Sequence, residues 1–363
     1  MGLLTVSNLQ KSFGKTLVLD GVSFEIKQGG CIALLGPSGC GKSTTLRCIA
    51  GLESPDDGRV ELGGKLLNDG AHVVPPQERN MGLVFQSYSV WPHLTVFDNV
   101  AFGMKLRRVK SGEIRERVTR ILEMMKLGHL ADRRSWQLSG GQLQRVAVAR
   151  TLVVEPKLVL FDEPLSNLDA KLRLYMRVEI RSLLKRLGLS AVYVTHDQSE
   201  ASVVADKVAV MNEGRIEQIG SWNDLYYEPA SQFVAGFMGA GNVMDGTILA
   251  VNEDGVRVRL GEALADVTIV SQKAFAATPG KQIRVYVPPE AISLCSVGAG
   301  ACSARIESVL PGPGVCELEI DFGGKVKLSA VKLSTDDRPQ AGVECGVRFD
   351  SRYLRVLEEV SGP

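Results

Sequence analysis

Three short segments of the sequence carry residue types that can hold and cut a phosphate chain. The first, Gly-Pro-Ser-Gly-Cys-Gly-Lys-Ser at residues 36–43, matches the pattern GxxxxGK[ST]. Its glycines let backbone N–H groups close around a phosphate, while Lys42 can reach the β and γ phosphates and Ser43 can ligate Mg²⁺. The predicted nucleotide contacts are Gly36, Pro37, Ser38, Gly39, Cys40, Gly41, Lys42, Ser43 and Thr44.

The second segment is an acidic pair, Asp162-Glu163, which follows the apolar run 157–161. Two adjacent carboxylates at the end of a buried strand are costly unless a cation or a solvent-filled site receives them. We expect Asp162 to hold Mg²⁺ through its water shell and Glu163 to orient or deprotonate the attacking water. The alternative is a solvent-exposed strand end with two acids, which the phosphate-binding pattern at 36–43 disfavours.

The third segment, Leu-Ser-Gly-Gly-Gln at 138–142, precedes a helical stretch over residues 143–153. A glycine-rich turn at a helix N-terminus is a second anion site, and one nucleotide does not need two such sites in one chain. Taken alone, the segment is equally well explained as a helix cap.

Short apolar runs alternate with helical patterns from residue 1 to about 235, which is typical of a mostly parallel sheet covered by helices. Runs 30–36 and 157–162 are predicted strands buried on both faces, and a helix is predicted over 43–50. Another helix is expected from Ser111, as its N-cap, because apolar residues recur at helical spacing. They are Ile114, Val118, Ile121, Leu122 and Met125.

The pattern changes after residue 230 to alternating apolar and polar residues, which predicts half-buried antiparallel strands. Examples are residues 256–260 and 283–287, and a hairpin is expected to turn at Gly323-Gly324. The C-terminal third is therefore predicted to be a small all-β module.

The 363-residue length favours two domains, and 42 basic against 41 acidic residues give no global attraction to nucleic acid. No apolar run reaches the length of a membrane span, and the first residues lack the pattern of a secretion signal, so a cytoplasmic chain is expected. The seven cysteines contain no CxxC pair, which favours reduced and mostly buried thiols.

The segments at 138–153 and 158–164 together resemble the signature and Walker B segments of ABC ATPases. Four further matches follow the order of that family's pattern: an adenine-stacking aromatic, the Q-loop glutamine, the D-loop and the switch histidine. These are Phe13, Gln86, residues 166–169 and His196. Phe13 replaces the more usual tyrosine and Cys40 stands where many relatives have serine, which bears on nucleotide affinity and thiol sensitivity.

The resemblance implies an α/β P-loop NTPase cassette over residues 1–236, with a helical subdomain at about 88–155. An all-β, OB-like regulatory or dimerisation domain would follow at 237–363. The implied catalytic residues are Glu163, His196 and Gln86, and the implied Mg²⁺ ligands are Ser43, Gln86 and Asp162. The signature residues Ser139, Gly140, Gly141 and Gln142 of a second copy would complete the ATP site, and Asp169 is a further implied nucleotide contact.

The resemblance also implies an ATPase that powers solute import at the cytoplasmic face of the cell membrane. Its partners would be a second copy, two integral membrane permease subunits and a periplasmic or extracellular solute-binding protein, with no nucleic acid. The stretch 87–96 is expected to form a groove for the permease, although Tyr88 and Trp91 packing inside the helical insert stays open. The alternative function is a soluble ABC-type ATPase acting on nucleic acid or ribosomes, which generally has two cassettes or a long insert.

Overall fold

A computed structural model describes residues 2–239, 241–252, 255–261, 264–269, 278–299, 302–312, 314–323, 326–333 and 339–357. The contacts divide the chain into two compact units, Met1–Ser221 and Trp222–Pro363. Each unit is described by itself below.

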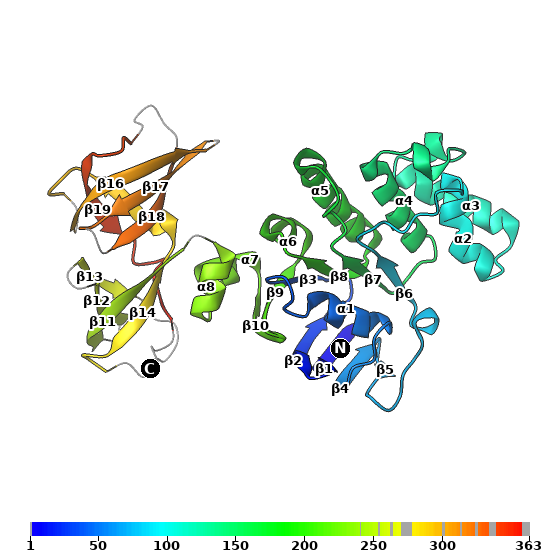
Figure 1. The fold of residues 1–363 in the computed structure, drawn as a ribbon, viewed down its shortest axis with the longest axis horizontal. Helices are drawn as coiled ribbons and strands as arrows, with labels where there is room; N and C mark the ends of the chain where they lie inside the picture. Colours follow the sequence, from blue (N-terminus) through cyan, green and yellow to red (C-terminus); the bar gives the residue numbers. More distant parts are fainter. Residues whose placement is uncertain are drawn as a thin grey trace. The chain divides into compact units, whose positions relative to one another are not determined.

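The first unit is built around a six-stranded sheet with the order β10-β9-β3-β8-β7-β6 (Figure 1). The strands from β9 to β6 are parallel, and β10 pairs with β9 in the antiparallel sense. Every residue of β3 and the first four residues of β7 are buried, so the two continuous apolar runs have the environment that the sequence predicted. The strands are β3 (Cys31–Leu35), β6 (Met81–Val84), β7 (Leu158–Asp162), β8 (Ser190–Thr195), β9 (Lys207–Asn212) and β10 (Arg215–Gly220).

A second, antiparallel sheet in this unit has the order β2-β1-β4-β5. Its apolar face shares one core with the helix α1 and with β3, β7 and β8, and this core includes Leu46 and Ile49 of α1. The helix that follows the phosphate-binding pattern is therefore fixed between two sheets. The elements are β1 (Leu4–Phe13), β2 (Thr16–Ile26), α1 (Lys42–Ala50), β4 (Asp57–Leu62) and β5 (Lys65–Asn68).

A helical insert lies between β6 and β7 and gathers beside the β6 edge of the sheet in Figure 1. The five apolar residues predicted for one helix face are buried, but the helix begins at Ser111 itself and Lys110 is the capping residue. Ser111, predicted as the N-cap, is thus the first helical residue, and no side-chain hydrogen bond caps this helix. The insert comprises α2 (Val96–Leu106), α3 (Ser111–Met124), α4 (Gly140–Leu152) and the short turns η2 (Gly128–Leu130) and η3 (Ser135–Gln137).

Three further helical segments complete the first unit: η1 (Pro76–Glu78), α5 (Ala170–Leu187) and α6 (Gln198–Val204). In the sequence, α5 follows β7 and α6 follows β8. Both helices therefore start at the edge where the parallel strands end. None of the described helices in the chain combines the length and the apolar character that crossing a membrane requires.

The second unit holds two five-stranded antiparallel sheets, β13-β12-β11-β14-β20 and β15-β19-β16-β17-β18, which share one apolar core. The predicted hairpin is the pair β17 and β18; residue 324 of its expected turn lies outside the described residues. The bounds are β11 (Asn242–Asn252), β12 (Gly255–Leu260), β13 (Ala265–Ile269), β14 (Gln282–Val287), η4 (Pro289–Ala291), β15 (Ile292–Cys295), β16 (Cys302–Pro311), β17 (Val315–Asp321), β18 (Lys327–Leu333), β19 (Glu344–Phe349) and β20 (Arg355–Leu357).

Two short helices, α7 (Trp222–Tyr227) and α8 (Gln232–Met238), belong to the second unit. Ala235 of α8 packs with Tyr286 of β14 and Leu357 of β20, and Tyr226 of α7 donates a hydrogen bond of 3.0 Å to Glu290. The contact boundary after Ser221 therefore lies before these helices, whereas the predicted domain boundary at 236 falls inside α8.

Candidate functional site

The loop between β3 and α1 is tightly closed. Gly39 and Gly41 have φ angles of 83° and 104°, which side-chain-bearing residues rarely adopt. A Cβ atom on Gly36 would collide with the Met211 carbonyl oxygen and lie 2.7 Å from the Cys40 sulfur. The glycines of the pattern are thus required by the backbone path, and the strand–loop–helix context predicted for it is present.

Lys42 places its ammonium group inside this loop. Its Nζ donates hydrogen bonds of 2.8 Å to the carbonyl oxygens of Gly36 and Pro37, and the side chain is only 5% exposed. Among the described ion pairs none involves Lys42, so its positive charge is available to an anion. The Cys40 sulfur lies 3.7 Å from Nζ; burial raises the pKa of the Cys40 thiol, and the nearby ammonium opposes that shift.

Ser43 and Asp162 come together at the start of α1. The Ser43 hydroxyl donates a hydrogen bond of 2.8 Å to Oδ1 of Asp162, the last residue of β7. A hydroxyl and a carboxylate side by side provide the hard oxygen ligands that Mg²⁺ prefers. The two predicted ligands therefore fit a magnesium ion.

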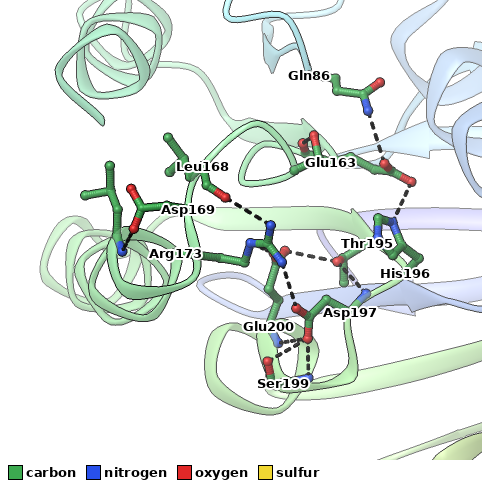
Figure 2. Close-up of polar contacts among 12 residues, drawn as sticks. Gln86, Glu163, Leu168, Asp169, Arg173, Thr195, His196, Asp197, Ser199 and Glu200 are labelled. Carbon is green, nitrogen blue, oxygen red and sulfur yellow. Dashed lines mark hydrogen bonds and ion pairs between the residues drawn. The ribbon is translucent and has the colours of Figure 1, made fainter. Parts of the chain in front are cut away.

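Glu163 lies between two predicted catalytic side chains, as Figure 2 shows. Gln86 Nε2 donates a hydrogen bond of 3.3 Å to Oε2 of Glu163, and His196 Nδ1 lies 3.3 Å from Oε1. These residues follow β6, β7 and β8, whose C-terminal ends meet at one edge of the sheet. The Glu163 backbone has a φ of 46°, the left-handed conformation, and its N–H donates to the Val194 carbonyl at 3.0 Å.

The segment 166–169 is tied to the same edge. Ser166 Oγ donates to the Glu163 carbonyl at 3.0 Å, and Asn167 Nδ2 donates to the Gln86 carbonyl at 2.8 Å. Asp169 caps α5 and accepts a hydrogen bond of 2.9 Å from the Leu172 N–H. The link from Asn167 to Gln86 was not foreseen, and two polar residues 81 positions apart give no sequence signal for it.

The segment 139–142 forms the N-terminus of α4. Ser139 is the capping residue, and its N–H donates to Oε1 of Gln142 at 2.9 Å, so the helix-cap interpretation describes this local structure. A Cβ atom on Gly141 would lie 2.8 Å from Leu172 of α5. None of the described hydrogen bonds or ion pairs connects 139–142 to the loop 36–43.

The predicted aromatic residues differ in their surroundings. Phe13, at the end of β1, is 47% exposed, and Lys11 Nζ lies over its ring, 5.2 Å from the centroid. Trp91 is half-buried, with its ring centroid 4.2 Å from that of Phe102 and Arg150 over its face. Tyr88 packs against the apolar core of the insert. Tyr88 and Trp91 therefore pack against the helical insert, which is the alternative to a groove that was left open above. Most of the polar residues next to them in the sequence are exposed.

A group around Arg173 and Glu200 lies beside His196, and the sequence patterns did not identify it. Glu200 Oε2 accepts hydrogen bonds from Tyr193 at 2.9 Å and Thr195 at 3.0 Å. Its side chain is almost completely buried, and burial raises the pKa of Glu200. The only available signal was the position of Glu200, four residues after the predicted switch histidine.

Comparisons with known proteins agree with this geometry. The family model described as ABC transporter matches residues 19–166. The chain is 41% identical over 362 residues to the Fe(3+) ions import ATP-binding protein FbpC of Brucella abortus, covering 99% of this chain and 98% of that protein. It is 52% identical over 240 residues to the maltose/maltodextrin import ATP-binding protein MalK of Yersinia pestis, covering 66% and 64%.

Two further proteins extend the comparison. The sn-glycerol-3-phosphate import ATP-binding protein UgpC of Chromobacterium violaceum is 40% identical over 361 residues, covering 98% of this chain and 94% of that protein. Among solved structures, cbiO1 of Clostridium perfringens, part of the ABC transporter complex cbiONQ, has a TM-score of 0.57 and 31% identity. That match covers 62% of this chain and 91% of the other.

Proposed function

Because this chain belongs to the ABC transporter family, as an ATP-binding subunit of the import type, we propose that its three convergent loops hydrolyse ATP to drive solute import. ATP is the nucleotide of this family and membrane permeases are its partners. The observation that carries the proposed chemistry is the placement of Glu163 between Gln86 and His196, at the sheet edge where the loop 36–43 begins.

We propose the following roles in the site. Lys42 and the backbone N–H groups within residues 36–44, other than Pro37, bind the β and γ phosphates, and Phe13 stacks on adenine. Ser43, Gln86 and Asp162 would hold Mg²⁺, which neutralises charge on the phosphate oxygens. Glu163 orients the attacking water or accepts its proton, and a neutral His196 can bind both the γ phosphate and that water.

We further propose that a second copy of the chain completes each site. Residues 139–142 form a helix N-terminus that nothing described connects to the loop 36–43 in the same chain. Such an N-terminus stabilises a phosphate, so Ser139, Gly140, Gly141 and Gln142 would cover the ATP bound by the other copy. Asp169, which caps α5, would be a further contact at this interface. Loss of the γ phosphate on hydrolysis would then weaken the contact between the two copies.

For the C-terminal OB-like unit we propose support of the dimer and regulation of the ATPase. The unit spans Trp222–Pro363 and has its own apolar core. Both its length and its core are those of a domain that can fold independently. A chain ending after Ser221 should then dimerise less readily or lose a regulatory response. Unchanged dimerisation, ATPase activity and transport would contradict the proposal.

The assignment to import is tested by what the chain assembles with in its own cells. We expect co-purification with integral membrane proteins, including the permease pair, and attachment at the cytoplasmic face together with a solute-binding protein outside. Recovery with ribosomes or DNA would instead favour the soluble ABC-type ATPase. The solutes named for the relatives are a metal ion, a sugar and a phosphate ester. Sequence identity to these ATP-binding subunits therefore does not specify the transported solute.

A further inference from the structure

Arg173, in the first turn of α5, contacts two loops that border Glu163. Its Nη2 donates a hydrogen bond of 3.0 Å to the Leu168 carbonyl, in the segment 166–169. Its Nη1 lies 3.6 Å from Oδ2 of Asp197, the residue after His196, and its Nε lies 3.9 Å from Oε1 of Glu200. Figure 2 shows the guanidinium group between these two loops.

The residues on both sides of His196 are held by this group of contacts. Thr195 Oγ1 donates to Glu200 at 3.0 Å and accepts a hydrogen bond of 2.9 Å from the Asp197 N–H. Asp197 caps α6 and accepts from the Ser199 N–H at 2.8 Å. The imidazole itself is 56% exposed, and its described polar contact is with Glu163. These contacts therefore hold the backbone on both sides of His196, from which the imidazole reaches Glu163.

Charge explains why an arginine is needed at this point. Asp197 and Glu200 are two carboxylates one helical turn apart, and without a cation they would repel each other. Within the described part of the chain, Arg173 is the cation that lies within 4 Å of both. The planar guanidinium donates to the Leu168 carbonyl while it lies within ion-pair distance of both acids, a fixed arrangement that a flexible ammonium group reproduces only in part.

We propose that Arg173 is a positioning residue for the hydrolysis of ATP, which couples the segment 166–169 to the loop 195–200 and so fixes His196 opposite Glu163. The proposal rests on the proposed function, since it assigns His196 to the site. A movement of Leu168, next to Asp169, is transmitted through the guanidinium to Asp197 and the adjacent imidazole. Contact of a second copy with Asp169 would thus reach the hydrolytic centre.

The test uses the full chain with Arg173→Met, which removes the charged fork but keeps the length of the side chain. We expect kcat for ATP hydrolysis to fall about tenfold or more, because small displacements of catalytic groups are costly in rate. The affinity for ATP, measured by calorimetry, should stay within about twofold because the loop 36–43 is untouched. Arg173→Lys, which keeps the charge, should restore part of kcat.

Arg177→Met is the matched control, one turn further along α5. Arg177 is also half-buried, and none of its described contacts is an ion pair or hydrogen bond to either loop. This variant should keep kcat within about twofold. An equal loss of kcat in Arg177→Met, or a loss in Arg173→Met matched by a lower melting temperature and weaker ATP binding, would reduce Arg173 to a structural residue.

A double variant tests whether Arg173 affects hydrolysis through His196 or independently of it. If Arg173 acts through His196, then Arg173→Met should lower single-turnover hydrolysis less than about twofold in a His196→Ala background. The same fold loss in both backgrounds, or an unchanged kcat in Arg173→Met alone, would overturn the proposal. Absence of ATP hydrolysis in the unaltered chain would contradict the proposed function itself, which is a different outcome.

Discussion

The Ser43 hydroxyl donates a 2.8 Å hydrogen bond to the Asp162 carboxylate, although 119 positions separate the two residues in the sequence. This contact joins the first turn of α1 to the end of β7. Both side chains present oxygen atoms of the kind that Mg²⁺ prefers, so Ser43 and Asp162 would together hold the ion, which would neutralise charge on the phosphates. The remaining groups of the site are arranged around this pair.

Replacement of the proposed base should separate ATP binding from hydrolysis. Glu163→Gln keeps a side chain of the same shape but removes the carboxylate that contacts Gln86 and His196. We expect ATP to bind and the chain to dimerise, with phosphate release reduced by about a hundredfold or more. Turnover equal to that of the unaltered chain would exclude Glu163 as the base, and Glu116→Gln, on the exposed face of α3, is the control.

Removal of the buried ammonium group should abolish nucleotide binding. Lys42 forms no ion pair with any residue that the structure describes, so Lys42→Ala leaves the phosphates without their principal side-chain cation. Calorimetry with ATP should show no measurable binding, while Lys65→Ala on β5, an exposed lysine, should bind normally. Tight binding by Lys42→Ala would contradict the phosphate-binding role of the loop.

Arg79 should contribute strongly to the stability of the first unit. Its side chain is 1% exposed and donates to the carbonyls of Cys48, Ile49 and Val74, so its charge meets the negative end of α1. Arg79→Met would leave these carbonyls without their donor, and we expect a loss of about 3 kcal/mol in the free energy of unfolding. Urea denaturation measures this quantity.

The control for that measurement lies on α1, the helix whose last carbonyls accept hydrogen bonds from Arg79. Arg47 of α1 is exposed, so Arg47→Met should change the free energy of unfolding by no more than about 0.5 kcal/mol. Similar losses in both variants would show that removal of any positive charge close to the end of α1 is destabilising and that burial of Arg79 is unimportant.

Asp206 should make the free energy of unfolding depend on pH in the acidic range. Burial would raise the pKa of its carboxyl, but hydrogen bonds from Arg181, Lys185 and the Cys31 N–H outweigh burial and lower the pKa to about 2. A carboxyl whose pKa is lower in the folded state stabilises the protein above its unfolded pKa, near 3.8, and that stabilisation is lost as the pH falls toward 2.

Asp206→Asn should therefore reduce the free energy of unfolding at pH 7 by about 1 to 2 kcal/mol, allowing for solvent screening, and flatten its decrease between about pH 4 and 2. Denaturation curves at several pH values check both expectations. Asp132→Asn, at an exposed position, should leave the pH profile unchanged. A profile for Asp206→Asn that coincides with that of the unaltered chain would contradict the ion-pair account.

The sequence predicted the elements that follow from local patterns. Unbroken apolar runs identified β3 and β7 because strands buried on both faces need apolar residues throughout. The spacing of Ile114, Val118 and Ile121 identified the buried face of α3. Motif residues marked the ends of strands, and parallel strands bring their ends to one edge, so Gln86, Glu163 and His196 could be expected to meet.

Contacts made over long separations could not be predicted in the same way. Arg79 lies in a turn rich in polar residues, and nothing in the sequence around it shows that its guanidinium reaches carbonyls 30 positions away. Trp91 sits in an aromatic stretch without a period, where only the packing of α2 and Arg150 decides between groove and core. The first position of α3 was missed because several residue types are compatible with a helix start.

The left-handed backbone conformation of Glu163 sets the stability of the fold against hydrolytic activity. A glutamate at a φ of 46° destabilises the fold by about 1 kcal/mol relative to glycine, so stability alone would favour a smaller residue there. A library of variants selected only for heat resistance should therefore accumulate glycine or asparagine at position 163. Such variants would lose ATP hydrolysis. Directed improvement of this protein has to screen turnover and thermal tolerance together.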